Sequence, residues 1–266
     1  MRLVTYARTS GRPRVGIVQG GAIVDPDRAL RAAAEMRHPG AGEAAQLPTE
    51  MVAFFEAGPC GRDLGALALE LVAEHGPELT APDGVSAVLP ADSVRLLAPV
   101  PRPRRMRDYL TYNGHAAGSG LGVPAAFTAM PICYKCNTET VVGPNDPLLW
   151  PSYTGQLDFE LELGFFTSGG LNLTSGEAAG RQFSFAEVLA WASLDEPVYP
   201  GEFFAVGTVG GGCGLELDRW IQPDDVVELE ASSVGVLRNP VGAGQVAPPG
   251  ASLPSYTGAP RVGDRH

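Results

Sequence analysis

The feature that most constrains this chain is a stretch of strict alternation, Leu157-Asp158-Phe159-Glu160-Leu161-Glu162-Leu163. Alternation with period two predicts a β-strand whose three carboxylates project from one face. Side chains two residues apart on a strand are separated by roughly 6.5–7 Å, so neighbouring carboxylates can converge on one ion. Like charges on one face repel, and a hard cation such as Mg²⁺ or Ca²⁺ would relieve the repulsion. A solvated acidic face has the same pattern, and the strand alone leaves both interpretations open.

Bulk properties predict a soluble, globular protein. The 266 residues, of which 44% are hydrophobic, can form one large core or a small domain beside a larger one. A formal net charge of −11 argues against nucleic acid and anionic membrane surfaces as partners. The sequence contains neither a run of about 18 apolar residues nor a secretory signal, so we expect a cytoplasmic protein without membrane spans.

The four cysteines do not form a disulfide scaffold in a chain of this length. Cys133 and Cys136 make a C-x-x-C pair, but a zinc site would need a second pair, and Cys60 and Cys213 stand alone. A thioredoxin-like pair opens a helix, whereas the residues that follow this one predict a strand and then a turn. We therefore expect ordinary buried or half-buried thiols.

Composition divides the chain into three parts. Residues 1–98 predict a small α+β domain, residues 99–240 a larger domain rich in strands, and residues 241–266 a Gly/Pro-rich tail. A connector rich in Pro and Arg, residues 99–105, starts the second part in an extended conformation. The pattern as a whole predicts an α+β, β-rich fold.

Local signals place elements in the first part. Residues 14–24 predict a hairpin, with Gly20-Gly21 at a turn that tolerates positive φ. Thr49 is the expected N-cap of a helix over residues 50–57, which Gly58 ends. A second helix is expected over residues 61–75.

The second part has one clear helix among its strands. Ser184-Phe185-Ala186-Glu187 is a capping box that opens this helix, which should end near Leu194. A strand over residues 202–208 leads into the glycine-rich residues 207–214, which lack the features of a nucleotide-binding loop. Backbone amides there can still approach a substrate oxygen closely, because glycine has no side chain. Residues 226–230 and 234–237 predict a final strand pair.

His115 is the histidine of most interest, since it follows the connector in Arg107-Asp108-Tyr109-Leu110-Thr111-Tyr112-Asn113-Gly114-His115. A single histidine in a loop usually makes a structural or solvent hydrogen bond. Taken alone, its surroundings do not distinguish that role from catalysis.

An ordered set of motifs carries more information than any one of them. The motifs are Arg107-Asp108…His115, Met130-Pro131-Ile132-Cys133-Tyr134, Gly143-Pro144, Leu157–Glu162, Gly207-Thr208…Leu215-Glu216-Leu217, Pro223–Glu228 and Gly235–Asn239. In this order they resemble the fumarylacetoacetate hydrolase family. The resemblance covers the small amino-terminal domain and both ends of the second part, residues 99–240, which would be the catalytic domain.

The resemblance implies a mixed β-roll that holds Mg²⁺, Ca²⁺ or Mn²⁺ and acts on a small oxo acid, and it implies a homodimer. By residue type and motif, Asp108, Glu160 and Glu162 match the metal ligands, while Asp158 matches a neighbouring acid that is not usually a ligand. His115 matches the general base and Glu216 the acid that orients it. Tyr134 and Thr208 match substrate-contacting positions.

The sequence departs from the family after Phe165-Phe166. Members normally continue through a long segment that carries a last Asp ligand and substrate-binding Arg and Lys, whereas here residues 167–173 run almost directly into the Ser184 helix. The first hypothesis is hydrolysis of a C–C bond in a 1,3-diketo acid of the acylpyruvate or fumarylacetoacetate type. The alternatives are a 2-oxo-acid decarboxylase or keto–enol isomerase, and a degenerate or repurposed member that does not hydrolyse its ligand.

Overall fold

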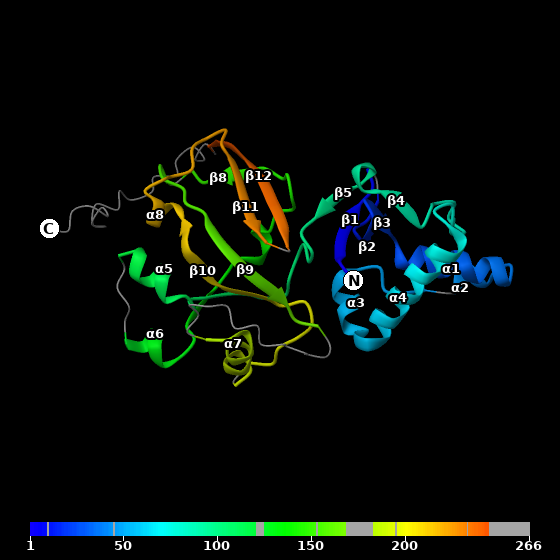
Figure 1. Cartoon of the computed structure of the whole chain (residues 1–266), viewed down its shortest axis with the longest axis horizontal. Helices are drawn as coiled ribbons and strands as arrows, with labels where there is room; N and C mark the ends of the chain where they lie inside the picture. The colour runs from blue at the N-terminus through cyan, green and yellow to red at the C-terminus, as the bar shows by residue number, and fades with distance from the viewer. Residues whose placement is uncertain are drawn as a thin grey trace, which may run out of the picture.

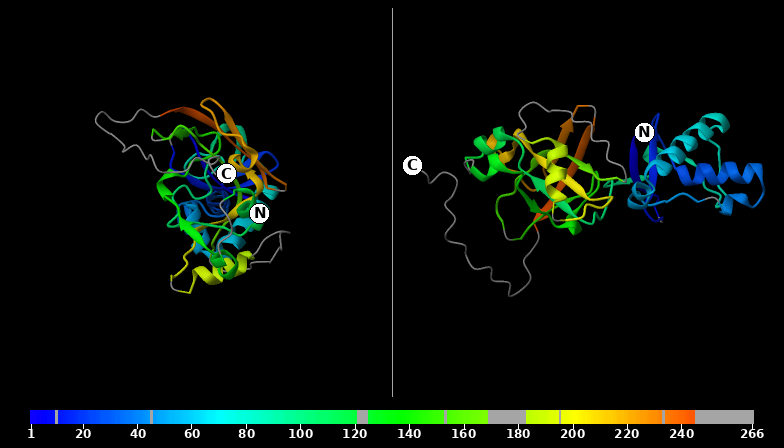
Figure 2. Two further views of the ribbon diagram at one scale, coloured as in Figure 1. Left: turned by 90° about the vertical axis from the view of Figure 1, so that its left-hand side faces the viewer. Right: turned by 90° about the horizontal axis from the view of Figure 1, so that it is seen from below.

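The computed structural model describes residues 1–9, 11–44, 46–120, 125–152, 154–168, 183–194, 196–232 and 234–244. These residues form two lobes that lie end to end (Figures 1 and 2). The tail predicted for residues 241–266 starts too early, because residues 241–244 belong to a strand that pairs with residues 148–150. The rest of that tail, and the junction around residues 171–173, lie outside the described residues. None of the described helices combines the length and apolar character needed to cross a membrane.

The first lobe is a five-stranded antiparallel sheet with helices beside it (Figure 1). The strands, in the spatial order β4-β3-β2-β1-β5, are Val88–Pro90, Ala22–Val24, Arg14–Gln19, Leu3–Ala7 and Arg95–Leu97. The helices are α1 (Pro26–Arg37), α2 (Ala41–Ala44), α3 (Met51–Glu56) and α4 (Gly58–His75), and a 3-10 turn covers Ala91–Ser93. The predicted hairpin is confirmed as β2 and β3, with positive φ at Gly20 and Gly21.

The expected cap at Thr49 is wrong. Helix α3 begins at Met51, and Glu50 is its N-cap residue without a side-chain capping bond. The carbonyl of Thr49 instead accepts a hydrogen bond from the amide of Val15 at 2.7 Å, which ties Thr49 to strand β2. Gly58, whose φ is +56°, follows the C-cap Ala57 and ends α3 as predicted. The same residue opens α4, with Pro59 in the first turn, where no N–H partner is needed.

The second lobe contains two smaller sheets. One has the order β7-β6-β10-β9, with strands Cys133–Lys135, Met106–Tyr109, Phe203–Cys213 and Glu160–Phe166. The other has the order β11-β12-β8, with strands Val226–Ala231, Gly235–Gly244 and Leu148–Trp150. The remaining elements are α5 (Asn113–Gly118), α6 (Ala125–Ala129), a 3-10 turn (Thr138–Thr140), α7 (Phe185–Ala192) and α8 (Gly214–Leu217). The pairs β6–β10 and β8–β12 are parallel and the others antiparallel, so both sheets are mixed.

Aromatic residues make the core beneath the first of these sheets. The ring of Phe204 stacks between Tyr109 and Phe165, with centroid distances of 6.2 and 5.2 Å. Helix α7 packs its buried Val188 and Leu189 against these rings. The predicted capping box of α7 is confirmed, because the side chains and amides of its Ser and Glu bond reciprocally, although the helix ends at Ala192.

Strand β10 continues through the glycine-rich residues and ends at Cys213, not at Thr208 as the sequence predicted. The pairing with β9 shifts register between Ala205 and Thr208 and again between Thr208 and Cys213. Gly207 has a φ of +97°, and a Cβ there would come within 2.6 Å of the carbonyl oxygen of Tyr109. Glycine therefore lets β10 pass close to the end of β6 while its bulges redirect neighbouring side chains.

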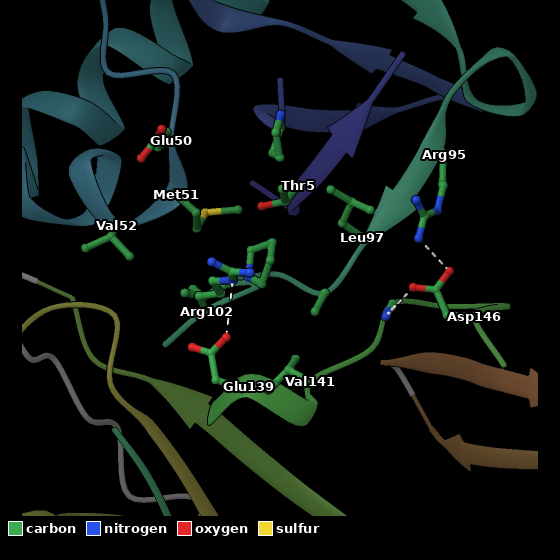
Figure 3. A pocket seen from close by; sticks show the side chains of 15 residues that line it. Thr5, Glu50, Met51, Val52, Arg95, Leu97, Arg102, Glu139, Val141 and Asp146 are labelled. Carbon is green, nitrogen blue, oxygen red and sulfur yellow. Dashed lines mark hydrogen bonds and ion pairs between the residues drawn. The ribbon is translucent and has the colours of Figure 1, made fainter. Parts of the chain in front are cut away.

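The lobes meet at a small interface. Phe55 of α3 packs on Phe166 of β9 with a centroid distance of 6.5 Å. A crevice of about 480 Å³ lies beside this contact, with lining residues from both lobes (Figure 3). Its ion pairs, Arg95–Asp146 at 2.7 Å and Arg102–Glu139 at 3.7 Å, join the first lobe and the connector to the second lobe.

Candidate metal centre and active site

Three carboxylates meet on one side of the four-stranded sheet β7-β6-β10-β9 in the second lobe. Asp108 comes from β6, and Glu160 and Glu162 come from β9, the two strands that flank β10. One carboxylate oxygen of each residue lies within 4.8 Å of the corresponding oxygens of the other two. The i, i+2 spacing of the two glutamates places them on one face of β9. The pairing of β6 and β9 with β10 brings Asp108 next to them.

Asp158 does not join this group, so the expectation that all three acids of the alternating stretch share one face is wrong. Strand β9 begins only at Glu160, and Asp158 lies before it. Its carboxylate accepts hydrogen bonds from the amides of Gly214 at 2.6 Å and Leu215 at 3.0 Å, at the start of α8. Asp158 therefore anchors α8.

Burial makes ionisation of the three carboxylates costly, and the charge of Asp108 adds to this cost for the two glutamates. Burial, followed by the negative charge of Asp108, raises the pKa of Glu162 to about 8. Hydrogen bonds at 3.1 Å from the Thr208 hydroxyl and the Gly207 amide offset part of this shift. The pKa values of Asp108 and Glu160 are also raised, chiefly by burial.

The cluster has no arginine or lysine partner among the described residues: its one ion-pair contact is with a histidine. Carboxylate oxygens are the donors that Mg²⁺, Mn²⁺ and Ca²⁺ prefer, and a divalent charge would stabilise the ionised carboxylates, which burial now disfavours. The donor set therefore fits a divalent cation.

His115 links this cluster to a second carboxylate. Its Nδ1 lies 3.0 Å from Oε2 of Glu216 in α8, and its Nε2 lies 3.9 Å from Oε1 of Glu160. The side chains of His115 and Glu216 are nearly buried. Burial acts to raise the pKa of Glu216, but the hydrogen bond with His115 and other donors outweigh it, and the net shift is downward. An ionised Glu216 fixes the imidazole with Nδ1 as the donor, which leaves Nε2 free to accept a proton.

Most of these groups line a cavity of about 380 Å³. Six of the seven residues predicted for the site line it: Asp108, His115, Tyr134, Glu160, Glu162 and Thr208. Glu216 lies behind His115, on the side away from the cavity. The hydroxyl of Tyr134 donates a hydrogen bond to Asp108, although much of that side chain is exposed. Leu110, Phe127 and Ile132 add apolar walls that the sequence did not indicate as part of a site.

The sequence interpretation missed Cys213. It ends β10, is 1% exposed, and its Sγ lies 3.4 Å from Oε2 of Glu216. The available signal was its position three residues before Glu216. Cys133 is exposed in β7 and lines the cavity, which corrects the expectation of a buried or half-buried thiol, whereas Cys136 is half-buried.

The chain matches a known protein family by sequence. The sequence model described as "Fumarylacetoacetate (FAA) hydrolase C-terminal" matches residues 105–181 and 167–242, which together span just over half of the chain. The two matches overlap at residues 167–181, where the sequence departs from the usual pattern. No curated protein sequence matches.

Solved structures are similar over nearly the whole chain. Maleylpyruvate hydrolase from Sphingobium sp. SYK-6, in complex with manganese(II) ion and pyruvate, is 17% identical with a TM-score of 0.58, over 92% of this chain and 100% of that one. Fumarylacetoacetate hydrolase from Exiguobacterium antarcticum is 18% identical with a TM-score of 0.56, over 91% and 99%. 2-Hydroxyhepta-2,4-diene-1,7-dioate isomerase from Mycobacterium marinum is 16% identical with a TM-score of 0.54, over 91% and 98%. These likenesses confirm the predicted β-rich α+β fold, and with the sequence match they show that the chain belongs to the fumarylacetoacetate hydrolase family.

Proposed function

We propose that this protein is a divalent-metal-dependent hydrolase that cleaves a C–C bond in a 1,3-diketo acid of the acylpyruvate or fumarylacetoacetate type. One observation carries the proposal: three carboxylates converge in a cavity, and the His115–Glu216 pair lies at their edge. The manganese and pyruvate bound by the similar maleylpyruvate hydrolase support both the cation and the class of substrate.

Asp108, Glu160 and Glu162 are the residues that would hold the cation. Three carboxylates are sufficient for Mg²⁺ or Mn²⁺, because such ions commonly keep water in several positions. When bound, the cation supplies positive charge that stabilises an enolate oxygen of the substrate. Tyr134 and Thr208 lie beside these carboxylates and are the proposed contacts for the substrate's oxygens.

His115 is the proposed general base. With its Nδ1 hydrogen directed to Glu216, the Nε2 lone pair is available on the side of the cavity. It takes a proton from water as the hydroxyl adds to the distal carbonyl of the diketo acid. The C–C bond then breaks, its electron pair forms the pyruvate enolate, and the proton held at Nε2 passes to the enolate carbon. The products are a carboxylic acid and pyruvate, so atoms and charge balance.

The test is turnover of acylpyruvates by the purified protein with Mg²⁺ or Mn²⁺, measured as pyruvate released. We expect turnover that requires the cation and is lost in His115→Ala. If the well-folded, cation-loaded protein leaves every acylpyruvate intact, the hydrolase proposal fails.

Isomerisation or decarboxylation of a 2-oxo acid is the second candidate, because an isomerase is among the similar structures. These reactions need the carboxylate-bound cation but no activated water. His115→Ala separates the candidates: retained turnover of oxaloacetate or of a keto–enol pair would favour the second. The homodimer and the assignment of Mg²⁺ in particular also stay proposals, and sedimentation and metal competition would test them.

A further inference from the structure

A second group of potential ligands lies behind His115, on the side away from the carboxylate cavity. His115 comes from α5, Cys213 from the end of β10, and Glu216 from α8. Each residue has one potential ligand atom that lies within 4.8 Å of those of the other two. The three side chains are almost fully shielded from solvent. The hydrolytic mechanism uses the histidine and the glutamate and leaves the thiol without a role.

The three distances come within a few tenths of an ångström of the edges of a small coordination tetrahedron. Nδ1 of His115 lies 3.0 Å from Oε2 of Glu216, Sγ of Cys213 lies 3.4 Å from the same oxygen, and Sγ lies 3.9 Å from Nδ1. In a tetrahedral zinc site, metal–sulfur bonds of about 2.3 Å and metal–nitrogen or –oxygen bonds of about 2.0–2.1 Å give ligand–ligand edges of roughly 3.3–3.6 Å. Shifts of a few tenths of an ångström would bring all three atoms to coordinating positions.

The donor set selects a different cation from the one that suits the carboxylate cluster. One sulfur, one imidazole nitrogen and one carboxylate oxygen suit Zn²⁺ or Co²⁺, whereas three carboxylates suit Mg²⁺ or Mn²⁺. A thiolate and a carboxylate would also balance the two positive charges, so the buried group would carry no net charge. Three protein ligands leave a fourth position for water.

We propose that His115, Cys213 and Glu216 form a second, inhibitory site for a thiophilic divalent cation of the Zn²⁺ type. Binding releases the thiol proton of Cys213 to solvent, because the thiolate is the ligand. The imidazole coordinates through Nδ1, so its proton moves to Nε2 and the ring stays neutral. Inhibition rests on the proposed hydrolytic function, because a protonated Nε2 can no longer accept a proton from water. Cation binding itself does not depend on that function.

Cobalt(II) gives a direct readout, because a thiolate bound to it produces a charge-transfer absorption band in the near ultraviolet. The reduced, metal-stripped protein is titrated with Co²⁺ in excess Mg²⁺, and Zn²⁺ is then added in competition. We expect one equivalent of the thiolate band in the wild-type protein and its displacement by Zn²⁺. In Cys213→Ser the band should disappear, and Zn²⁺ affinity should fall at least about 100-fold, because a ligand is lost outright.

Two further variants keep the test decisive. Cys136→Ser, which disrupts the C-x-x-C pair, should retain the band. A variant in which Cys60, Cys133 and Cys136 are all serine leaves the proposed site intact and should also retain it, even if Cys213→Ser fails to fold. Loss of the band in the triple variant, or its persistence in a folded Cys213→Ser, would overturn the proposal.

Turnover separates this inference from the proposed function. If the protein hydrolyses acylpyruvates, Zn²⁺ added in excess Mg²⁺ should inhibit the wild type at least tenfold more strongly than Cys213→Ser. A thiolate band in a protein that hydrolyses nothing would retain the second site and reject only the hydrolase. Turnover without a band, even at saturating Co²⁺, would reject the second site and retain the hydrolase.

Discussion

Asp25 in the first lobe is buried and Glu162 in the second lobe is half-buried, and the partners of these two carboxylates differ. Asp25 accepts hydrogen bonds from Arg14 at 2.6 Å, Arg28 at 2.8 Å and the hydroxyl of Tyr6. Burial acts to raise its pKa, yet these partners outweigh burial and the net pKa is below the ordinary value. Glu162 faces Asp108, no described arginine or lysine pairs with it, and its pKa is raised to about 8.

The contrast distinguishes structural charge from functional charge. In the first lobe the chain supplies its own cations, and the network ties the sheet to α1 through Asp25, which is also the N-cap of that helix. In the carboxylate cluster of the second lobe, no arginine or lysine among the described residues compensates the negative charge, which costs stability unless a cation arrives. The first network stabilises the fold, whereas the second is expected to bind a ligand.

The largest expected effect is on turnover. Glu160→Ala/Glu162→Ala should lower kcat/KM for an acylpyruvate by at least about 10³-fold, since a bound cation contributes several kcal/mol and 1.4 kcal/mol is tenfold. Glu228→Ala/Glu230→Ala is the matched control, because it removes the same i, i+2 pair from the exposed face of β11. Equal losses in the two double variants would show that the position of the first pair is unimportant.

Replacing Asp25, whose charge is compensated by arginines, should instead lower the stability of the fold. Asp25→Ala leaves two guanidinium groups without their shared partner, and losing one member of such a buried network costs about 3–5 kcal/mol. Denaturant unfolding followed by circular dichroism measures this loss. Cation affinity in the second lobe should stay within about threefold of wild type, and a joint loss of stability and affinity would erase the contrast.

Glu216→Gln should act on catalysis without acting on the carboxylate-bound cation. A neutral amide holds the Nδ1 hydrogen of His115 less firmly, and we expect kcat to fall by about 10²-fold. Titration calorimetry should show Mg²⁺ or Mn²⁺ affinity close to that of the wild type. Weakened cation binding would mean that Glu216 belongs to the metal centre.

Acid should weaken the first lobe through Asp25. Because its folded pKa lies below the unfolded value of about 3.9, its contribution to stability is fully present above that value and is lost as the pH falls through the folded pKa. Unfolding midpoints measured below about pH 4 should therefore decline more steeply for the wild type than for Asp25→Ala. Parallel declines would show that Asp25 is not the responsible group.

The smallest effect is expected where both charges are exposed. Arg238 and Glu228 form an ion pair at 3.0 Å across β11 and β12, and each side chain is at least half exposed. Arg238→Ala should change the free energy of unfolding by less than about 1 kcal/mol. A larger change would show that burial is not what separates strong charge networks from weak ones in this molecule.

The sequence was most informative where a pattern is local. The alternation at Glu160 and Glu162 placed both side chains on one face, and the capping box of α7 was confirmed. Asp158 was misplaced because the start of β9 depends on pairing with β10, which alternation alone does not reveal. Strand β10 extends through its glycines for the same reason: neighbouring strands, not propensity, hold it extended.

Contacts between residues far apart in the sequence could not be predicted from local patterns. His115 and Glu216 are 101 positions apart, and only the family resemblance connected them. The position of Cys213 three residues before Glu216 was the one signal for its place beside His115, and the register shift of β10 between Thr208 and Cys213 is not visible in the sequence. The interface between the lobes likewise follows from packing of Phe55 on Phe166.

Isothermal titration of Mn²⁺ and Mg²⁺ into the metal-stripped protein tests the central claim most directly. We expect saturable binding with one equivalent at the carboxylate cluster, unchanged in Glu228→Ala/Glu230→Ala and abolished in Glu160→Ala/Glu162→Ala. Absence of binding to the folded wild-type protein, or binding that survives in Glu160→Ala/Glu162→Ala, would contradict the claim that these carboxylates are held together for a cation.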